Sequence, residues 1–439
     1  MNHSAPHRAL SPARLLTLTL LILLALLLAA CDDETPTPAA QADQPAAQAA
    51  AQDGSVAAAA PAVTPTPFLP QGDLVLWHSW AGPDADALTQ ILTQLKQEYP
   101  LLAVETLFVG PNDLPQAFAD AIAAGGGPDL AVTQNWWINN MVDVGVVSPL
   151  DDLLQPGQAD EFFAAALHDF QRDGTLYALP ITFELVSLFQ NTALTGGAAP
   201  PATTDALLAQ AEVSPTLGIG LYANLYHVWW GFPAYGTQLF DPSGRVVLDA
   251  SPGAADYLTW MKSLDASASS FVGTDYGELL ERFTKGEFAY FVDGPWATAE
   301  LRAALGESLA VAPLPAGPAG PAQPWLSADG VVLNPRLDAQ RSVLAFFLAS
   351  RLSSAESGTI FAAAAARLPA NQRATLPDDP VLRGFMAQAR TAQPAPAETE
   401  MEAVWGYGGD MLVKVLGGSM SGAQAVRETA ALINEETGR

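Results

Sequence analysis

Tryptophan and a few polar residues stand at positions where together they could form a binding surface. The chain has ten tryptophans. Eight of them lie near expected loops at strand ends: Trp77, Trp80, Trp136, Trp137, Trp229, Trp230, Trp296 and Trp405. Indole faces pack on the C–H faces of a sugar ring, and acids, amides or imidazoles bind its rim of hydroxyls. These residue types therefore favour recognition of a sugar-like ring.

Their positions divide these tryptophans into core and candidate ligand residues. A lone tryptophan is more often part of a core, and Trp77 lies inside an apolar run. Trp80 and the pair Trp136–Trp137 instead come just after expected strand ends, where binding residues concentrate. His78 and Asn135 stand next to them. We therefore expect all five to contact the ligand: Trp80, Trp136, Trp137 and His78 through their rings, and Asn135 through its amide. Trp77 is expected in the core.

Glu184 is the most informative acid because it interrupts an apolar stretch. Burying a carboxylate without partners is costly, so Glu184 is predicted to accept ligand hydroxyls; the alternative is a solvated residue on a strand edge. No Lys or Arg occurs among the candidate site residues, which disfavours an anionic ligand. A cation held by the aromatic rings and Glu184 stays open.

Catalysis is not expected from these residues. Glycoside hydrolysis would need two carboxylates about 5 to 10 Å apart, and although Glu184 and Asp293 could be nominated, no pattern positions them as a pair. The five histidines offer no convincing metal-ligand set, and no nucleophile elbow is present. We expect no enzyme, no metal and no cofactor; a lipid-anchored glycan hydrolase is the weaker alternative.

The N-terminus resembles a lipoprotein signal peptide. A basic segment precedes the apolar run Leu15–Leu28, which is shorter than the roughly 20 residues of a membrane span. The run ends at Leu28-Ala29-Ala30-Cys31, small residues before the only cysteine. Residues 1–30 are therefore predicted to be removed and Cys31 to carry the lipid. Residues 31–71, rich in Ala, Pro, Gln and Thr, are predicted to form a disordered tether.

The net charge narrows the possible partners, and the order of strands and helices narrows the fold class. The net charge of −27 argues against nucleic acid as a partner. Apolar runs at 74–77, 104–109, 130–132 and 288–292 are typical of strands, and they alternate with helical patterns at 84–98 and 114–124. Asp84 is expected to cap the first helix, and Pro295 to begin another. Alternation of this kind predicts an α/β fold with mostly parallel sheets, closed by helices at 401–416 and 422–436.

Several motifs in one order resemble the extracellular solute-binding proteins of carbohydrate ABC importers, especially the maltose/maltodextrin-binding branch. They cover most of residues 73–436. The motifs are Trp77-His78-Ser79-Trp80, Gly126-Gly127-Pro128-Asp129, Gly174 to Pro180 followed by Asn191, Phe283 to Phe288, and Asp293-Gly294-Pro295-Trp296. Each motif is weak alone, and their common order makes the resemblance specific.

The resemblance implies a two-lobe periplasmic-binding-protein fold of type II. One lobe would comprise residues 72–183 plus 328–373, and the other 184–327 plus 374–439, with a ligand cleft between them that closes by a hinge motion. The function implied is that of a monomeric binding protein that hands a neutral sugar or oligosaccharide to ABC-transporter permease subunits. It would sit at the outer face of the cytoplasmic membrane, held by lipidated Cys31.

The resemblance also assigns roles to single residues. Glu184 matches a hinge-strand glutamate that accepts sugar hydroxyls, and Trp296 and Trp405 match two stacking tryptophans. Tyr226 and Trp229 match residues of the second lobe, whereas Asn224 stands where the family has an acid. In the first lobe Ala81, Gly82, Trp136 and Trp137 replace charged ligands, so maltose itself is not expected. A non-sugar ligand such as an organic cation or oligopeptide, and a receptor that only signals, stay as alternatives.

Overall fold

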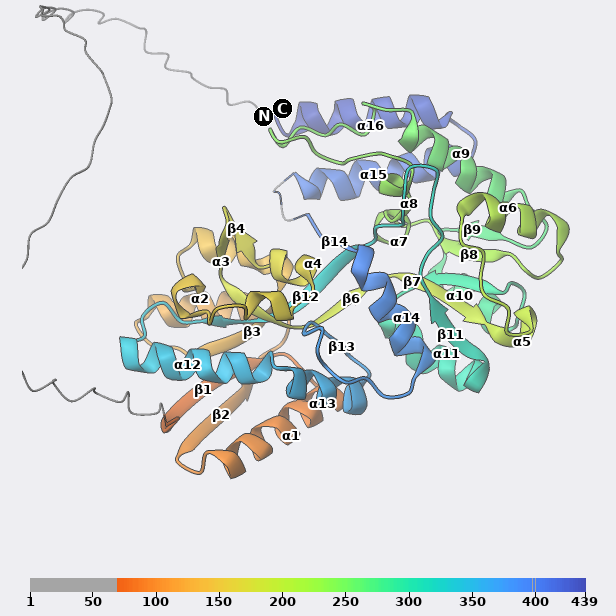
Figure 1. Ribbon diagram of the computed structural model, residues 1–439. Coiled ribbons are helices and arrows are strands. Elements are labelled where there is room, and N and C mark those ends of the chain that lie inside the picture. Colours follow the sequence, from red (N-terminus) through yellow and green to blue (C-terminus); the bar gives the residue numbers. More distant parts are fainter. Residues whose placement is uncertain (1–68, 397, 399) are drawn as a thin grey trace, which may run out of the picture. The chain divides into compact units, whose positions relative to one another are not determined.

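The computed structural model describes residues 69–439 except 397 and 399. The predicted signal segment, Cys31 and nearly all of the predicted tether lie outside these residues. Two sheets flanked by helices organise the described part (Figure 1). Among the described residues, no helix combines the length and the apolar character that crossing a bilayer requires.

The first sheet has the strand order β13-β6-β12-β3-β1-β2, with β14 paired to β12. Its strands are β1 (Gly72–His78), β2 (Leu102–Phe108), β3 (Leu130–Gln134), β6 (Ala178–Leu185), β12 (Trp325–Leu333), β13 (Leu368–Pro369) and β14 (Gln393–Pro394). β1 pairs in parallel with β2 and β3, whereas β12 runs antiparallel to β3 and β6. A separate hairpin joins β4 (Gln171–Arg172) and β5 (Thr175–Leu176).

The second sheet has the order β11-β7-β10-β8-β9. Its strands are β7 (Ser187–Asn191), β8 (Ile219–Tyr222), β9 (Phe271–Gly273), β10 (Tyr290–Asp293) and β11 (Leu309–Ala312). β8 is parallel to β9 and β10, and β7 is antiparallel to β10 and β11. Both sheets are therefore mixed rather than mostly parallel, because strands at the junction of the two sheets run against the βαβ strands.

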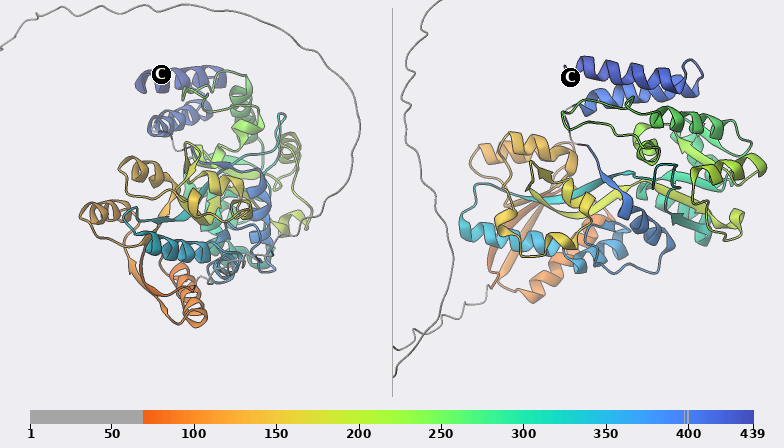
Figure 2. Two further views of the ribbon diagram at one scale, coloured as in Figure 1. Left: turned by 60° about the vertical axis from the view of Figure 1, so that its left-hand side comes forward. Right: turned by 45° about the horizontal axis from the view of Figure 1, so that its top comes forward.

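Helices surround each sheet, and we call each sheet with its helices a lobe. The first lobe carries α1 (Pro83–Glu98), α2 (Leu114–Ala123), α3 (Ile138–Asp143), α4 (Ala164–His168), α12 (Ala339–Leu352) and α13 (Ala355–Ala365). The second carries α5 (Thr192–Thr195), α6 (Thr204–Val213), α7 (Leu225–Val228), α8 (Gly231–Ala234), α9 (Gly253–Asp265), α10 (Tyr276–Thr284), α11 (Thr298–Leu305), α14 (Pro380–Gln388), α15 (Met401–Leu416) and α16 (Gly422–Glu436). α15 and α16 lie side by side next to α9 (Figure 2).

The chain passes between the lobes at β6 and β12, which we call the hinge strands. β6 leads directly into β7 of the second sheet, and β12 brings the chain back. A third passage follows β13, because α14 packs on β11. The β6–β12 register shifts at Asp329 and Gly330, leaving Ile181 as the extra residue of a bulge. Such bulges re-aim side chains. Here a Cβ on Gly330 would lie 2.5 Å from the Phe170 ring.

Local details depart from the sequence expectations at several ends. α1 is capped by Gly82 in the left-handed region (φ 54) with Pro83 first in the helix. Asp84 therefore does not cap α1 as predicted, and its carboxylate is used elsewhere. β10 begins at 290 rather than 288. Pro295 opens a short 3-10 turn, Pro295–Ala297, before α11. The two C-terminal helices have the predicted bounds.

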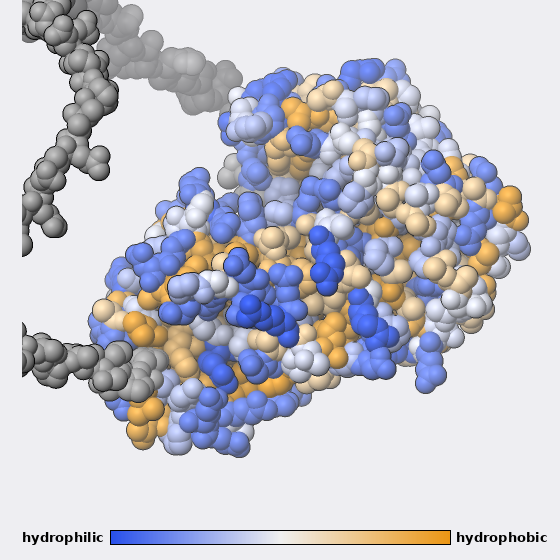
Figure 3. Space-filling view, viewed as in Figure 1, coloured by the Kyte–Doolittle hydropathy of each residue, from blue (hydrophilic) through white to orange (hydrophobic). Residues whose placement is uncertain are grey.

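Burial separates core tryptophans from the others. Trp77 is half-buried and packs on the core of the first lobe, as expected from its apolar strand. Trp230 and Trp325 are fully buried. On the face shown in Figure 3, hydrophobic areas are broken up by hydrophilic residues. Trp136, Trp296 and Trp405, in contrast, are partly exposed.

Candidate functional site

Three adjoining cavities lie where the carboxyl ends of parallel strands from both lobes meet, the usual ligand position in open α/β sheets. Glu184 lines all three. The first cavity, about 240 Å³, also has Trp80, Asp84 and Arg367 in its lining. The second, about 420 Å³, is lined by aromatic residues of the second lobe. The third, about 430 Å³, lies beside Trp296 and Arg367. We call the three together the cleft.

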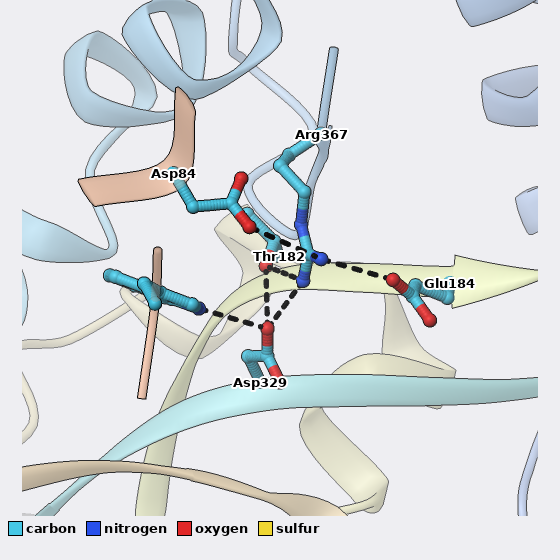
Figure 4. Close-up of polar contacts among 6 residues, drawn as sticks. Asp84, Thr182, Glu184, Asp329 and Arg367 are labelled. Carbon is cyan, nitrogen blue, oxygen red and sulfur yellow. Dashed lines mark hydrogen bonds and ion pairs between the residues drawn. The ribbon is translucent and has the colours of Figure 1, made fainter. Parts of the chain in front are cut away.

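A guanidinium surrounded by carboxylates forms one wall of the cleft (Figure 4). Arg367 donates from Nη1 to Glu184 Oε1 at 3.0 Å and lies 3.8 Å from Asp84 Oδ2. Its Nη2 donates to Thr182 Oγ1 at 2.9 Å and to Asp329 Oδ2. We call these five residues the polar wall: Asp84, Thr182, Glu184, Asp329 and Arg367.

Strand register explains why these residues meet. In the β13–β6 pairing, Leu368 faces Phe183, which sets Arg367 beside Glu184. In the β12–β6 pairing, Asp329 faces Thr182 just before the bulge. Ala366 adopts a left-handed conformation (φ 52) at the end of α13. Such a conformation is uncommon for a residue with a Cβ, and it turns the chain just before Arg367.

Burial and charge raise the pKa of two acids of the polar wall, Glu184 and Asp84. Burial raises the pKa of Glu184, Arg367 lowers it, and Asp329 and Asp84 raise it further, with a net rise. Burial likewise raises the pKa of Asp84 against the opposing effect of Arg367. Burial alone would lower the pKa of Arg367, but Asp329, Glu184 and Asp84 raise it above its ordinary value. Three acids therefore share one cation.

Aromatic side chains of the second lobe line another part of the cleft, which we call the aromatic wall: Tyr226, Trp296 and Trp405. Trp296 is 42% and Trp405 43% exposed, and both line the second cavity with Tyr226. The Tyr226 and Trp296 rings lie 6.1 Å apart. Burial, followed by the charge of Glu184, raises the pKa of Tyr226. The Tyr226 hydroxyl is therefore a hydrogen-bonding group across the working pH range.

A buried carboxylate supports the loop that carries Trp296. Asp293 is fully buried and accepts hydrogen bonds from the Tyr276 hydroxyl and the Gly294 N–H, both at 2.8 Å. His227 Nε2 lies 3.4 Å from Asp293 Oδ1, the oxygen that also accepts the Gly294 N–H. A Cβ at Gly294 would lie 2.1 Å from the Trp296 indole, so only glycine lets this ring fold back. Asp293 is thus enclosed and supports the loop; it does not face the cleft as a catalytic partner of Glu184 would.

The structure distributes the predicted first-lobe residues between cleft and core. Trp136 is 57% exposed and lines two cavities. Asn135 is 3% exposed, lines the second cavity, and has no hydrogen-bond partner at Oδ1. Trp80 is buried, lines the first cavity, and donates from Nε1 to Asp329 at 3.3 Å. Trp137 is half-buried against the core of the first lobe. His78 is buried beside Trp80, and burial lowers its pKa.

Two predicted second-lobe residues have structural roles. Asn224 caps α7 by accepting the Tyr226 N–H at 3.0 Å. Trp229 is 2% exposed and stacks on Trp325 with ring centroids 4.4 Å apart. It lines a different cavity, of about 720 Å³, that also includes Asp169. Neither Asn224 nor Trp229 lines any of the three cavities of the cleft.

Sequence reasoning missed the centre of the polar wall. Arg367 and Asp329 were not selected, and the expectation that the site holds no Lys or Arg is wrong for the cleft as the structure shows it. Arg302 also lines the third cavity, paired with Asp379 at 2.7 Å. The available signal was an Arg close to residue 373, where the first lobe is expected to end. Within the described part of the chain, no group of three or more His, Cys, Asp or Glu is arranged to hold a metal ion.

Known proteins resemble this chain in both sequence and fold. Residues 90–383 match the family described as bacterial extracellular solute-binding protein. A maltotriose-binding protein of Pyrococcus abyssi is 27% identical over 252 residues, which are 56% of this chain and 54% of that protein. The chain thus spans about half the length of this relative.

Solved structures give the same picture. A cyclo/maltodextrin-binding protein complexed with maltotetraose has a TM-score of 0.74 at 24% identity, over 83% of this chain and 97% of the other. A maltotriose-binding protein of Thermus thermophilus has a TM-score of 0.61 at 25% identity, over 83% and 100%. The predicted α/β periplasmic-binding-protein fold is confirmed.

Proposed function

This chain belongs to the bacterial extracellular solute-binding protein family, and we propose that it binds a sugar or oligosaccharide in the cleft and delivers it to an ABC importer. Membership confirms the expectation of a binding protein rather than an enzyme. The relatives that are described as binding maltotriose or maltodextrin support a glycan as the ligand class.

One observation carries the proposal: exposed indole rings and polar acceptors converge on the same cavities. Trp136, Trp296 and Trp405 are each at least 42% exposed, although large aromatic side chains are usually withdrawn from water. Glu184 borders every cavity they line. Flat apolar faces and fixed hydrogen-bond acceptors are the two surfaces that a sugar ring requires.

The division into lobes supports closure around the ligand. We retain residues 72–183 plus 328–373 and residues 184–327 plus 374–439 as the proposed moving units. Trp136 comes from the first lobe and Trp296 from the second, so a ligand bridging them would favour the closed arrangement by its contacts to both.

The lipid anchor and the permease partner are two further parts of the proposed function. Cys31 is proposed to carry a lipid after removal of residues 1–30, which would hold the protein at the outer face of the cytoplasmic membrane on a tether. A mass increase on Cys31 that disappears in Cys31→Ser would support this. The permease subunits are proposed as the recipients of the ligand.

Calorimetric titration of the full-length chain with mono- and trisaccharides, and with organic cations that carry no sugar ring, tests the function. We expect saturable heat with at least one sugar, weakened in Trp296→Ala. The matched control is Leu101→Ala, which removes an exposed apolar side chain just before β2, next to the amino end of that strand. Heat with organic cations alone, or with no compound, would contradict the proposed ligand class.

A further inference from the structure

The polar wall carries more negative charge than its one guanidinium balances. Asp84, Glu184 and Asp329 all pair with Arg367. Three carboxylates against one guanidinium leave an excess of acid next to the first cavity. Arg302 in the third cavity offers no compensation because Asp379 already pairs with it.

Arg367 has no donor left for an anionic ligand. Nη1 lies against Glu184 and Asp84, and Nη2 against Thr182 and Asp329. Its Nε is buried without a partner and out of reach of solvent. An anionic ligand would have to displace one of these carboxylates and then face the other two at close range.

Glu184, in contrast, keeps capacity toward the cleft. Its side chain is 38% exposed, and only Oε1 contacts Arg367. Asp84 Oδ2 is near the same Arg367 Nη1 atom, and Asp84 lines the first and third cavities with Glu184. A ligand donor placed between these two carboxylates would meet both, and an ammonium gains more from such a position than a hydroxyl because its hydrogen bonds are charge-assisted.

A second, independent observation also calls for a ligand donor. Asn135 is buried, lines the second cavity, and leaves Oδ1 without a partner. Buried carbonyl oxygens are normally satisfied. Trp136, which follows it, presents an exposed ring to the first and second cavities. Aromatic faces attract cations as well as sugar C–H groups.

From this geometry we infer that the preferred ligand is an amine-bearing saccharide, with its ammonium between Glu184 and Asp84 and its ring faces on the tryptophans. The inference rests on the proposed sugar-binding function and narrows it to cationic sugars. Neutral sugars bind the same cleft, but more weakly.

Matched pairs of sugars test the inference on the full-length chain. The members of each pair differ only by an amine in place of a hydroxyl on every ring: glucosamine and glucose, galactosamine and galactose, and the β-1,4-linked glucosamine trimer and cellotriose. We expect the amine to bind at least tenfold more tightly at low ionic strength in the pair that binds best. The advantage should shrink in 0.5 M salt, where charges are screened within about 4 Å.

Variants locate the effect. In Glu184→Gln and in Asp84→Asn the ratio of the two affinities should fall at least threefold, and because both sugars are measured on one variant, a general loss of binding cancels. Asp86→Asn is the control, since Asp86 is exposed in the same first turn of α1 and its ratio should match that of the unmodified chain.

Two results would overturn the inference. Equal affinity for amine and hydroxyl sugars, within twofold, would contradict it and leave the proposed function intact. An amine preference that Glu184→Gln and Asp84→Asn do not reduce would also contradict it. Absence of heat with every sugar would instead refute the proposed function together with the inference.

Discussion

The two walls of the cleft are built by different means. The polar wall comes from the hinge strands, from Asp84 of α1 and from Arg367 just before β13, and its charged atoms are already paired with one another. The aromatic wall consists of rings that remain 42–43% exposed at Trp296 and Trp405. The polar wall is therefore set before a ligand arrives, whereas the aromatic wall gains most of its contacts from the ligand.

Arg367 and the exposed tryptophans should therefore contribute to different quantities, the free energy of folding and the free energy of binding. The Arg367 guanidinium is held by the other residues of the polar wall, so its loss should be felt mainly in folding stability. Half-exposed indoles contribute little to the folded state and much to a bound ring. Replacing Arg367 should therefore affect mainly unfolding and replacing an exposed tryptophan mainly affinity, whereas Glu184 and Asp84 also face the ligand.

The largest effect is expected from Arg367→Met. Removing the guanidinium leaves three neighbouring carboxylates without their cation, and the free energy of unfolding should fall by about 3 kcal/mol. Urea denaturation at pH 7 measures this. Arg383→Met is the matched control, because Arg383 pairs with the exposed Asp378 and such surface pairs contribute about 0–1 kcal/mol. Equal losses in the two variants would show that the polar wall is not a stabilising unit.

Asp169 sharpens the comparison, because it is a buried carboxyl group without a cation. It accepts the Ala395 N–H at 3.2 Å, and its Oδ2 has no partner. Burial raises the pKa of Asp169 well above its ordinary value, while the backbone donors at Ala395 and Ala328 lower it less. The native state thus keeps the proton longer than the unfolded state, so stability is lost as pH rises from about 4 toward the raised pKa.

Asp169→Asn removes this titration. The stability of the variant relative to the unmodified chain should increase between pH 4 and pH 8 by at least about 1 kcal/mol. Urea denaturation of both proteins at the two pH values gives the difference. A constant difference across this range would mean that Asp169 ionises in the native state as it does in the unfolded chain.

Trp296→Ala should weaken sugar binding about tenfold, which corresponds to about 1.4 kcal/mol. Its stability should change by less than about 1 kcal/mol because the ring is partly exposed. Calorimetric titration and urea denaturation of the same preparation give both values. A large loss of stability with unchanged affinity would reverse the roles given to the walls.

The smallest effect on binding is expected from Trp229→Phe. The Trp229 ring stacks on Trp325 and lines none of the three cleft cavities, so affinity should stay within twofold. The free energy of unfolding should fall by about 1–2 kcal/mol from the smaller ring in a packed core. A tenfold loss of affinity at unchanged stability would restore Trp229 to the binding site.

Fold and family were readable from the sequence because they depend on distributed signals. Apolar runs alternating with helical stripes predicted the α/β lobes, and ordered motifs predicted the family. Single side chains were harder. Trp229 and Trp296 have the same residue type and similar settings in the sequence, yet one stacks in the core and the other lies in the cleft. Tertiary packing, absent from local sequence, decides between them.

Arg367 shows a second limit. Its partners Asp84 and Glu184 are more than 180 positions away in the chain. Strand register brings Glu184 to it, and the packing of α1 on α13 brings Asp84. A one-residue change in the β13–β6 register would place Arg367 on the other face. The bulge at Asp329 has the same character, because it depends on Gly330 fitting against Phe170. Such features follow from pairing geometry and carry no motif.

A crystal structure of the full-length chain with its tightest-binding sugar tests the central claim most directly. We expect a sugar ring between Trp136 and Trp296, with Glu184 accepting a hydrogen bond from one of its hydroxyl or ammonium groups. A sugar seated instead in the cavity of about 720 Å³ beside Trp229 and Asp169, with the cleft empty, would contradict it.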